Sequence, residues 1–331
     1  MTSYIGRDPN VVNRRITSNL TITVASSGGD FTTVGAAYDS LDDAFIEAGV
    51  TVTISVGAGT FVESTITLDH PQGQQINITG AGSGSTTLSF SADGNNGFFC
   101  ENNRSGTIDA LTILSTSTTK YGVYANNVGI ILLGTGVVVD GWNSGIRAFN
   151  HSAITAVSVT VDDASSYGVF ANVGSTVYFT SGSITQTSVS GNSGLYCGGE
   201  SLVQADSCSI QGASRTGACV QCQGGTIIVD SADIDDGSYC ISADRPGSSV
   251  IARSANLNSA STHNVRAVGD VAIDLSSATN TNSAGYGVLA SDGVGSMLQA
   301  LLLRDIPAEI TIRRSTPPLP MALWSTHRIA T

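Results

Sequence analysis

A short pattern of apolar and polar residues recurs nine times along the chain, at a spacing of about 23 residues. In each occurrence a small residue, most often glycine, precedes an apolar residue, a variable residue and a second small or apolar residue. The occurrences begin at Gly97, Gly122, Gly145, Gly168, Gly194, Gly217, Cys240, Asn264 and Gly287. Repeats of this length are typical of solenoids, in which each coil buries its apolar face only against its neighbours.

The columns of this repeat can be assigned to faces, because successive side chains of a strand point to opposite sides. The second residue of each repeat is apolar and the fourth is mostly Ala or Cys, so both columns should point inward. The third column should therefore point outward. It contains Phe99, Tyr124, Arg147, Phe170, Tyr196, Cys219, Ser242, Arg266 and Leu289.

A second strand is predicted in each coil, where apolar and polar residues alternate again. Its last apolar members are Val139, Val161, Ile184, Ile210, Ile234 and Leu257. Parallel strands need either long crossover connections or a coil, and no amphipathic helical stretch lies between these strands. The pattern therefore excludes a βαβ fold and predicts an all-β, right-handed parallel β-helix.

One helix is predicted near the start of the chain, over residues 33–48. Val34, Ala37, Tyr38, Leu41, Phe45 and Ala48 share one face of it, and Gly49 follows its end. We expect this helix to cap the N-terminal end of the solenoid. The predicted organisation is an N-terminal attachment segment (1–25), the β-helix (26–303) and a proline-rich C-terminal tail (304–331) that serves as a cap, trimer or docking segment.

The proportion of charged residues is low, and these residues are unevenly distributed along the chain. Asp, Glu, Lys and Arg make up 12% of the chain, about half the usual share. Residues 21–299 carry 7 basic and 23 acidic residues, whereas the two ends carry 7 basic and 3 acidic residues. An acidic body disfavours nucleic-acid binding, and the basic ends look like contact points for other proteins.

No apolar run approaches the length of a membrane span, and Met1–Arg15 lacks the apolar core of a secretion signal. We expect no membrane insertion. The six cysteines fall mostly where small buried residues belong, which favours reduced structural thiols. Cys219 and Cys222 form a C-x-x-C pair without a second pair at zinc spacing, so neither a metal site nor a cofactor is expected.

The N-terminal quarter contains Gly29-Asp-Phe-Thr-Thr-Val-Gly-Ala-Ala-Tyr38, then Val52-Thr-Ile-Ser-Val-Gly-Ala-Gly-Thr-Phe61 and Ile78-Thr-Gly-Ala-Gly82. This part resembles the opening of the pectin-lyase-like β-helix superfamily, pectin methylesterases in particular. The resemblance implies the fold and not an activity. The Asn-Thr-Asp and Gly-His-Gly segments of polygalacturonases and the Gln-Asp-Thr and Asp-Phe-Ile-Phe-Gly segments of the esterases are absent from the sequence.

The segment Ser3-Tyr-Ile-Gly-Arg-Asp-Pro-Asn10 is similar to the N-terminal segments of structural fibres from marine short-tailed bacteriophages. In those fibres this segment anchors the protein to the virion. Phage tailspikes are commonly homotrimeric β-helices. The resemblance thus implies a virion protein, assembled in the host cytoplasm, that contacts other virion proteins through its terminal segments.

The outward column is the first candidate site. Phe99, Tyr124, Phe170 and Tyr196, with Arg147 and Arg266, should form a ladder with one rung per coil. Exposed aromatic rings in such a row would be unfavourable in water, because each can bury about 150–250 Å². A trimer interface, a platform that stacks sugar rings, and loops folded over the ladder would each cover them.

The polar residue after each second strand is the other candidate. This column contains Asp140, Asp162, Thr185, Gln211, Asp235 and Asn258. Asp140 and Asp162 on adjacent coils would lie about 5 Å apart, close to the carboxylate separation in retaining glycosidases. Ordinary turn formation is the other explanation, and a third is calcium binding by Asp162, Asp163, Asp230, Asp233, Asp235 and Asp236.

The sequence therefore predicts a structural protein of a bacteriophage virion, a tailspike or fibre. It would attach to host cell-surface polysaccharide, without catalysis. The alternative is a polysaccharide-degrading tailspike depolymerase, a hydrolase or lyase, with Asp140 and Asp162 as its carboxylates. A secreted bacterial adhesin is a third possibility that would require a secretion or autotransporter segment.

Overall fold

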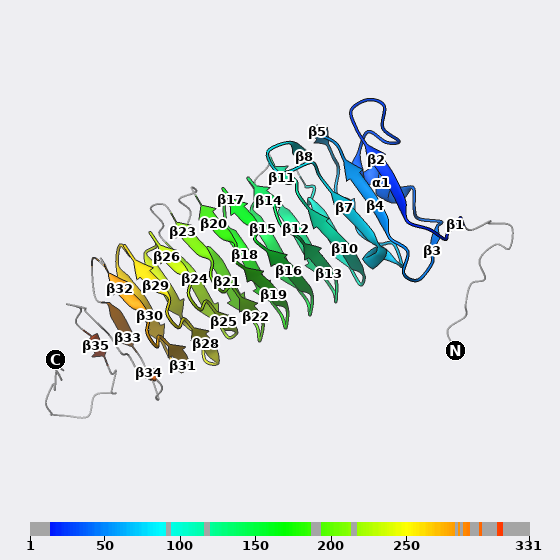
Figure 1. Ribbon diagram of the computed structural model, residues 1–331. Coiled ribbons are helices and arrows are strands. Elements are labelled where there is room, and N and C mark those ends of the chain that lie inside the picture. The colour runs from blue at the N-terminus through cyan, green and yellow to red at the C-terminus, as the bar shows by residue number, and fades with distance from the viewer. Residues whose placement is uncertain are drawn as a thin grey trace, which may run out of the picture.

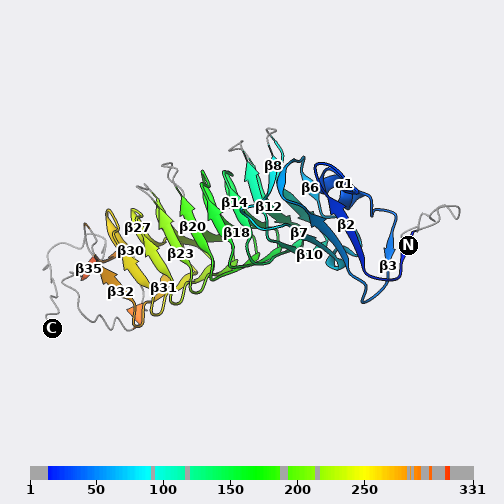
Figure 2. The same ribbon diagram turned by 45° about the horizontal axis from the view of Figure 1, so that its top comes forward.

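In a computed structural model the chain forms an elongated stack of coils from its N-terminal to its C-terminal end (Figures 1 and 2). The structure describes residues 14–313 except 91–93, 116–119, 187–192, 213–216, 282–283, 285–286, 292–297 and 300–309. Each coil contributes one strand to each of three parallel sheets, which contain 12, 10 and 11 strands. The parallel β-helix predicted from the repeat is confirmed.

Sheet I is the 12-stranded sheet. Its strands are β2 (Leu20–Val24), β4 (Val52–Val56), β7 (Ile76–Thr79), β10 (Arg104–Asp109), β13 (Ile130–Leu133), β16 (Ala153–Val157), β19 (Thr176–Thr180), β22 (Leu202–Gln204), β25 (Thr226–Ile228), β28 (Ser248–Ile251), β31 (Val271–Asp274) and β34 (Leu298–Gln299). The repeat pattern did not predict this third strand of each coil. Its first member, β2, lies within the segment that the sequence assigned to virion attachment.

Sheet II has 10 strands. They are β5 (Gly59–Val62), β8 (Thr86–Phe90), β11 (Thr112–Ser115), β14 (Val138–Asp140), β17 (Thr160–Asp162), β20 (Ser183–Gln186), β23 (Ser209–Gly212), β26 (Asp233–Asp235), β29 (Asn256–Asn258) and β32 (Thr279–Thr281). The predicted apolar column from Val139 to Leu257 is in register from strand to strand.

Sheet III has 11 strands and contains all nine sequence repeats on consecutive strands. Its strands are β6 (Ile66–Thr67), β9 (Phe98–Glu101), β12 (Tyr121–Asn126), β15 (Ser144–Phe149), β18 (Tyr167–Asn172), β21 (Leu195–Gly198), β24 (Ala218–Gln223), β27 (Tyr239–Ala243), β30 (His263–Val268), β33 (Val288–Ser291) and β35 (Ile310–Arg313). The inward columns form one continuous apolar core, as expected for a solenoid.

The alignment of one repeat is corrected by the strand register. Val220, and not Ala218, pairs with Leu195 and Ile241, and Gln221 pairs with Tyr196. The outward residue of β24 is therefore Gln221. Cys219 was predicted to face outward but is 1% exposed. A shift of two residues leaves the alternation of faces unchanged, which is why the apolar pattern alone did not reveal it.

The predicted helix is much shorter than expected. It is confined to α1 (Val34–Asp39), where the Thr33 side chain accepts a hydrogen bond from the backbone N–H of Ala36. Residues Phe45–Ile46 form β3, which pairs with β1 (Arg15–Ile16) in a separate two-stranded sheet. This pairing replaces the helical hydrogen bonds and leaves Phe45 48% exposed instead of buried. That the helix caps the solenoid stays a prediction.

A short 3-10 helix, η1 (Gly73–Gln75), precedes β7. Its neighbours His70 and Gln72 hydrogen-bond to the backbone of Ala44 and Ile46. These contacts connect the first full coil to the strand that replaces the end of the predicted helix.

Candidate functional site

The outward column of sheet III places five candidate residues side by side on successive strands. Phe99 pairs with Tyr124, Tyr124 with Arg147, Arg147 with Phe170, and Phe170 with Tyr196. The alternation of faces along each strand forces these side chains to the same side of the sheet. The sequence repeat was thus sufficient to bring this group together.

At one end of this column three rings pack against one another. Phe170 and Tyr196 are stacked, with ring centroids 4.8 Å apart and an angle of 7° between the planes. Tyr167 lies against both, at 5.1 Å from Phe170 and 5.3 Å from Tyr196. Phe170 is only 7% exposed as a result. The neighbouring rings therefore provide much of the cover that the sequence led us to expect from a partner subunit, a sugar chain or loops.

At the other end Tyr124 joins two rings. Its centroid lies 5.3 Å from that of Phe99 and 5.1 Å from that of Tyr121. Such tilted and edge-on pairs each add about 0.5–1.5 kcal/mol beyond the burial of their area. The rings are half-buried and present their remaining surface to solvent.

Arg147 connects the two groups of rings. Its guanidinium carbon lies 4.5 Å from the centroid of Tyr121 and 4.3 Å from that of Phe170, and Phe149 and Tyr124 lie 5.3 and 5.9 Å away. Its buried Nε has no hydrogen-bond partner, and within the described part of the chain it forms no ion pair. Stacking on aromatic faces, and not an opposite charge, holds this cation in place.

We call this continuous surface the aromatic ladder. Its members are Phe99, Tyr121, Tyr124, Arg147, Phe149, Tyr167, Phe170 and Tyr196. The sequence prediction missed Tyr121, Tyr167 and Phe149, which lie outside the four-residue repeat. The recurrence of Tyr-Gly-Val at residues 121–123 and 167–169 is the signal that would have identified the two tyrosines.

Arg266 was predicted in the same group but belongs to a separate cluster further along sheet III. Its guanidinium lies 5.6 Å from the ring of Tyr239, and its Nη1 lies 3.2 Å from Ser242 Oγ and 3.5 Å from Asp244 Oδ2. Strand β24, which presents Gln221 in the outward column, separates this cluster from the ladder.

The hydroxyls of Tyr124, Tyr167 and Tyr196 stay protonated at neutral pH. Burial raises the pKa of Tyr124, Tyr167 and Tyr196 above the usual value, and the charge of Arg147 partly offsets this for the first two. Tyr196 donates a hydrogen bond to Oε1 of Gln223 at 3.2 Å. The ladder thus combines apolar ring faces with hydroxyl groups that donate and accept hydrogen bonds.

Asp140 and Asp162 lie next to each other on sheet II, as predicted, because they are register partners on β14 and β17. Burial raises the pKa of both carboxyl groups, and the neighbouring carboxylates raise each of them further. They belong to a different sheet from the aromatic ladder, so the two predicted sites do not form one site.

No group of three or more His, Cys, Asp or Glu side chains placed to hold a metal ion occurs within the described residues. The aspartates that the sequence offered for calcium form other contacts, such as the hydrogen bond from Asn256 to Asp233. No helix among the described residues is long and apolar enough to cross a membrane.

Comparison with known proteins gives no match to a family model and no match to a curated protein. Among solved structures, the A-module of the mannuronan C-5 epimerase AlgE6 of Azotobacter vinelandii is 14% identical, with a TM-score of 0.49 over 78% of this chain and 74% of that one. ORF18 of Geobacillus virus E2 is 13% identical, with a TM-score of 0.40 over 83% of this chain and 62% of that one.

An alginate lyase from Paenibacillus is also similar, at 13% identity and a TM-score of 0.29 over 87% of this chain and 96% of that one. Identities this low concern the fold alone. The three parallel sheets described above establish by themselves that the chain is a parallel β-solenoid.

Proposed function

We propose that this protein is a structural protein of a bacteriophage virion, a tailspike or fibre, that attaches to host cell-surface polysaccharide through the aromatic ladder without catalysis. The observation that carries the proposal is the ladder itself, a row of packed and partly exposed rings on one face of the solenoid, joined by an arginine that forms no ion pair with the described residues.

The chemistry of the ladder suits a sugar chain. A pyranose ring has apolar C–H faces that stack on aromatic rings and a rim of hydroxyls that hydrogen-bond to tyrosine and arginine. The ladder extends over β9, β12, β15, β18 and β21, or about 19 Å at the usual strand spacing. A surface of this length can contact several consecutive sugar units.

The ends of the chain support the virion part of the proposal. The similarity of Ser3–Asn10 to phage fibre segments and the basic character of both ends favour contacts with other virion proteins. Both features concern residues that lie largely outside the described part of the chain. A pull-down of purified virion structural proteins with the full chain, and with a chain lacking residues 1–13, would test this.

The ladder is tested by replacing Tyr124 and Phe170 with Ser in the full-length protein. Affinity electrophoresis through gels containing purified capsular or O-chain polysaccharides measures binding. We expect the double variant to bind at least about tenfold more weakly, because two stacking surfaces are lost. Tyr178→Ser, which removes an exposed ring from sheet I, is the matched control and should bind like the unmodified protein.

Retention of full binding by the Tyr124→Ser, Phe170→Ser variant would contradict the proposal. The same variant tests the trimer-interface alternative, since we propose that the chain is a homotrimer. A trimer mass that falls to a monomer mass while the isolated monomer binds polysaccharide unchanged would assign the ladder to subunit contact instead.

Catalysis by a depolymerase is the second candidate, favoured by the adjacent Asp140 and Asp162 with their raised pKa values. A raised pKa favours the protonated form of a carboxyl group, which is the form that a general acid requires. Incubation with host polysaccharide and analysis of chain length tests this. Shortened chains that disappear with Asp140→Asn would show that the protein is an enzyme.

A further inference from the structure

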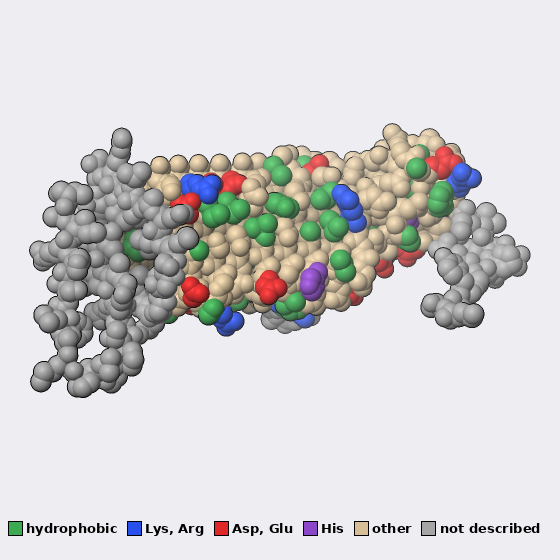
Figure 3. Space-filling model, turned by 90° about the horizontal axis from the view of Figure 1, so that it is seen from below, with side chains coloured by type: hydrophobic (Ala, Val, Ile, Leu, Met, Phe, Trp, Pro, Cys, Tyr) green, Lys and Arg blue, Asp and Glu red, His purple; other side chains and the backbone are tan. Residues whose placement is uncertain are grey.

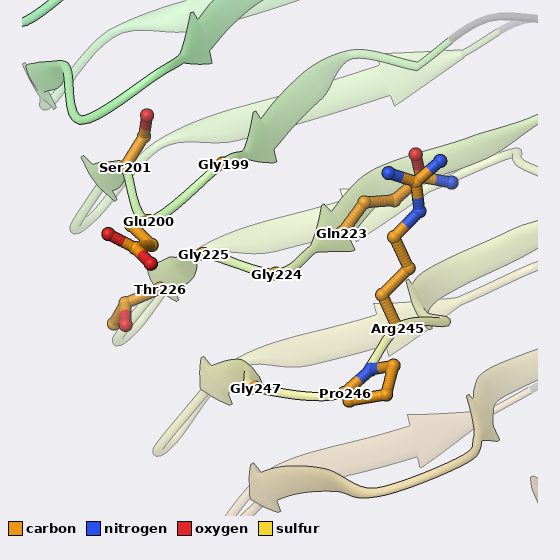
Figure 4. Close-up of a pocket in the computed structure, with 10 residues that line it drawn as sticks. All are labelled: Gly199, Glu200, Ser201, Gln223, Gly224, Gly225, Thr226, Arg245, Pro246 and Gly247. Atoms are coloured by element: carbon orange, nitrogen blue, oxygen red, sulfur yellow. The ribbon is translucent and has the colours of Figure 1, made fainter.

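The turns that connect sheet III to sheet I form a groove of about 630 Å³ across three successive coils (Figure 4). Glu200 and Gly224 follow strands β21 and β24, and Arg245 and Gly247 follow β27. We call this hollow the turn groove. It is separate from the Asp140–Asp162 pair, which lies on sheet II.

Glycines are frequent in the turns that line the groove, at Gly199, Gly224, Gly225 and Gly247. Backbone hydrogen bonds connect the equivalent turns of neighbouring coils, from Val128 to Asn150, from His151 to Val173 and from Glu200 to Gly224. In contrast to these glycines, Val128 in an earlier turn is 62% exposed.

The floor of the groove is open backbone. Gly224 and Gly247 have φ values of +78° and +80°. A Cβ atom at Gly247 would meet nothing within 4 Å, and one at Gly224 would meet only the carbonyl oxygen of Pro246 at 3.8 Å. Another molecule can therefore approach the main chain closely here.

Two unpaired charges flank this floor. In Figure 4 the Glu200 carboxylate lies on the side of Thr226, whereas the Arg245 side chain extends to the opposite side, as Gln223 does. Within the described residues neither Glu200 nor Arg245 forms an ion pair. A carboxylate, an amide, a hydroxyl and a guanidinium around an open backbone supply donors and acceptors for the hydroxyls of a sugar.

The turn groove is continuous with the aromatic ladder. Gln223 accepts a hydrogen bond from the hydroxyl of Tyr196, the last ring of the ladder. Burial raises the pKa of Tyr196, and the nearby Arg245 lies close enough to counteract this rise. The groove therefore begins where the ladder ends.

We propose that the turn groove is a second subsite for the polysaccharide that the ladder binds, and that it takes one sugar unit by hydrogen bonds to its hydroxyls. The inference rests on the proposed function. It implies that a bound chain leaves the ladder after Tyr196 and crosses the edge between sheet III and sheet I.

The test fills the groove without disturbing the fold. Asn tolerates a positive φ better than most residues, and the space above Gly224 and Gly247 is open, so Gly224→Asn and Gly247→Asn should fold normally. Circular dichroism and melting temperature verify this. We expect each variant to bind at least about tenfold more weakly to the capsular or O-chain polysaccharide that the unmodified protein binds best.

Gly269→Asn is the matched control. Gly269 has a φ of +82° and open space around it, in the turn one coil beyond the groove. Unchanged binding by Gly224→Asn and Gly247→Asn, together with lost binding by Tyr124→Ser, Phe170→Ser, would overturn the groove subsite and leave the proposed function intact. Equal weakening by Gly269→Asn would also overturn it. Absence of binding by the unmodified protein to every polysaccharide would overturn both proposals.

Discussion

Arg147 shows how a single residue gives the ladder its character. Its guanidinium is held between Tyr121 and Phe170 without a carboxylate partner in the described structure. A stacked cation of this kind restricts the rings on both sides and keeps N–H groups available to a ligand. The stacking contact explains why a charged residue can occupy the outward position between Tyr124 and Phe170.

Asp140 and Asp162 should make the stability of the protein depend on pH. Their pKa values are raised in the folded chain, so folding favours their protonated forms. This contribution to stability is present at low pH and is lost as the pH rises through the range above the ordinary aspartate value of 3.8. Asp140→Asn should therefore raise the melting temperature at neutral pH more than at acidic pH.

Thermal unfolding across this pH range measures the effect. Asp270→Asn, at an exposed turn, should show no comparable change between acidic and neutral pH. A melting temperature of Asp140→Asn that follows the unmodified protein at every pH would contradict the interpretation that burial and the neighbouring carboxylates disfavour the charged form of Asp140.

The cysteines should be unreactive until the protein unfolds. All six are free and buried, and burial raises the pKa of Cys197 to about 12 and that of Cys208 to about 11. Since the thiolate is the reactive form, a thiol reagent should modify none of them in the native protein at mildly alkaline pH. In denaturant it should modify all six. Fast labelling of Cys219 in the native protein would show that the corrected register of β24 is wrong.

The sequence correctly predicted the side-chain positions that depend only on alternation within one strand. The outward positions of Phe99, Tyr124 and Phe170 follow from period-two alternation within one strand. The position of Gln221 did not, because it depends on how the preceding loop sets the register between β21 and β24. Contacts between residues on different strands, such as that of Arg147 with Tyr121, require the sheet twist and side-chain direction that a repeat does not contain.

At the scale of the strand, packing between sheets explains why glycine is frequent in the first column of the repeat. This column lies at the corner where sheet II meets sheet III. A Cβ atom added at Gly122 or Gly145 would overlap the Cγ1 of Val139 or Val161 in the adjacent strand of sheet II. Close approach of the two sheets therefore requires glycine in these coils, whereas Cys240 and Asn264 occupy the same corner further along.

Gly122→Ala should therefore destabilise the protein by about 1–3 kcal/mol, the usual range for overpacking a core. Denaturant unfolding followed by circular dichroism measures this. Gly84→Ala is the control, because a Cβ atom there would meet nothing within 4 Å. Equal stability of the two variants would show that the corner can relax without loss.

The predicted helix over residues 33–48 was too long, and the reason is also found at the scale of the element. Its apolar spacing is correct for a helix up to Leu41, but a short isolated helix is only marginally stable. The backbone N–H groups of Phe45 and Glu47 instead donate to the carbonyls of Arg14 and Ile16. Pairing with a strand far away in the sequence is information that local periodicity cannot provide.

At the scale of the molecule, the three sheets present three different chemistries. Sheet III carries the aromatic ladder, and sheet II carries the carboxylates of Asp140, Asp162, Asp233 and Asp235. Sheet I contains no charged residue in strands β13, β16, β19, β22, β25 and β28. The face seen from below, on the side where these strands lie in Figure 1, shows scattered apolar side chains on a mostly uncharged surface, with a few acidic, basic and histidine side chains (Figure 3).

The chain has a net charge of −12, so copies can approach with least repulsion along the six strands of sheet I that carry no charged residue. If the protein is a homotrimer, we expect sheet I to form the contact. Leu132→Glu combined with Ile228→Glu, both in outward positions of sheet I, should lower the mass in solution to that of a monomer and leave polysaccharide binding unchanged.

Light scattering after size exclusion gives the mass. Thr185→Glu, on sheet II, is the control and should preserve the oligomer. A variant mass equal to that of the unmodified trimer would exclude sheet I as the contact, and a monomeric unmodified protein would contradict the trimer itself.

The in-register stacking of coils has an evolutionary consequence. Because every internal strand of the solenoid meets equivalent neighbours on both sides, gain or loss of one whole coil would lengthen or shorten the ladder by a single rung while the remaining rungs keep their geometry. If the ladder binds a host polysaccharide as we propose, duplication or loss of a short gene segment would adapt it to a changed polysaccharide in discrete steps.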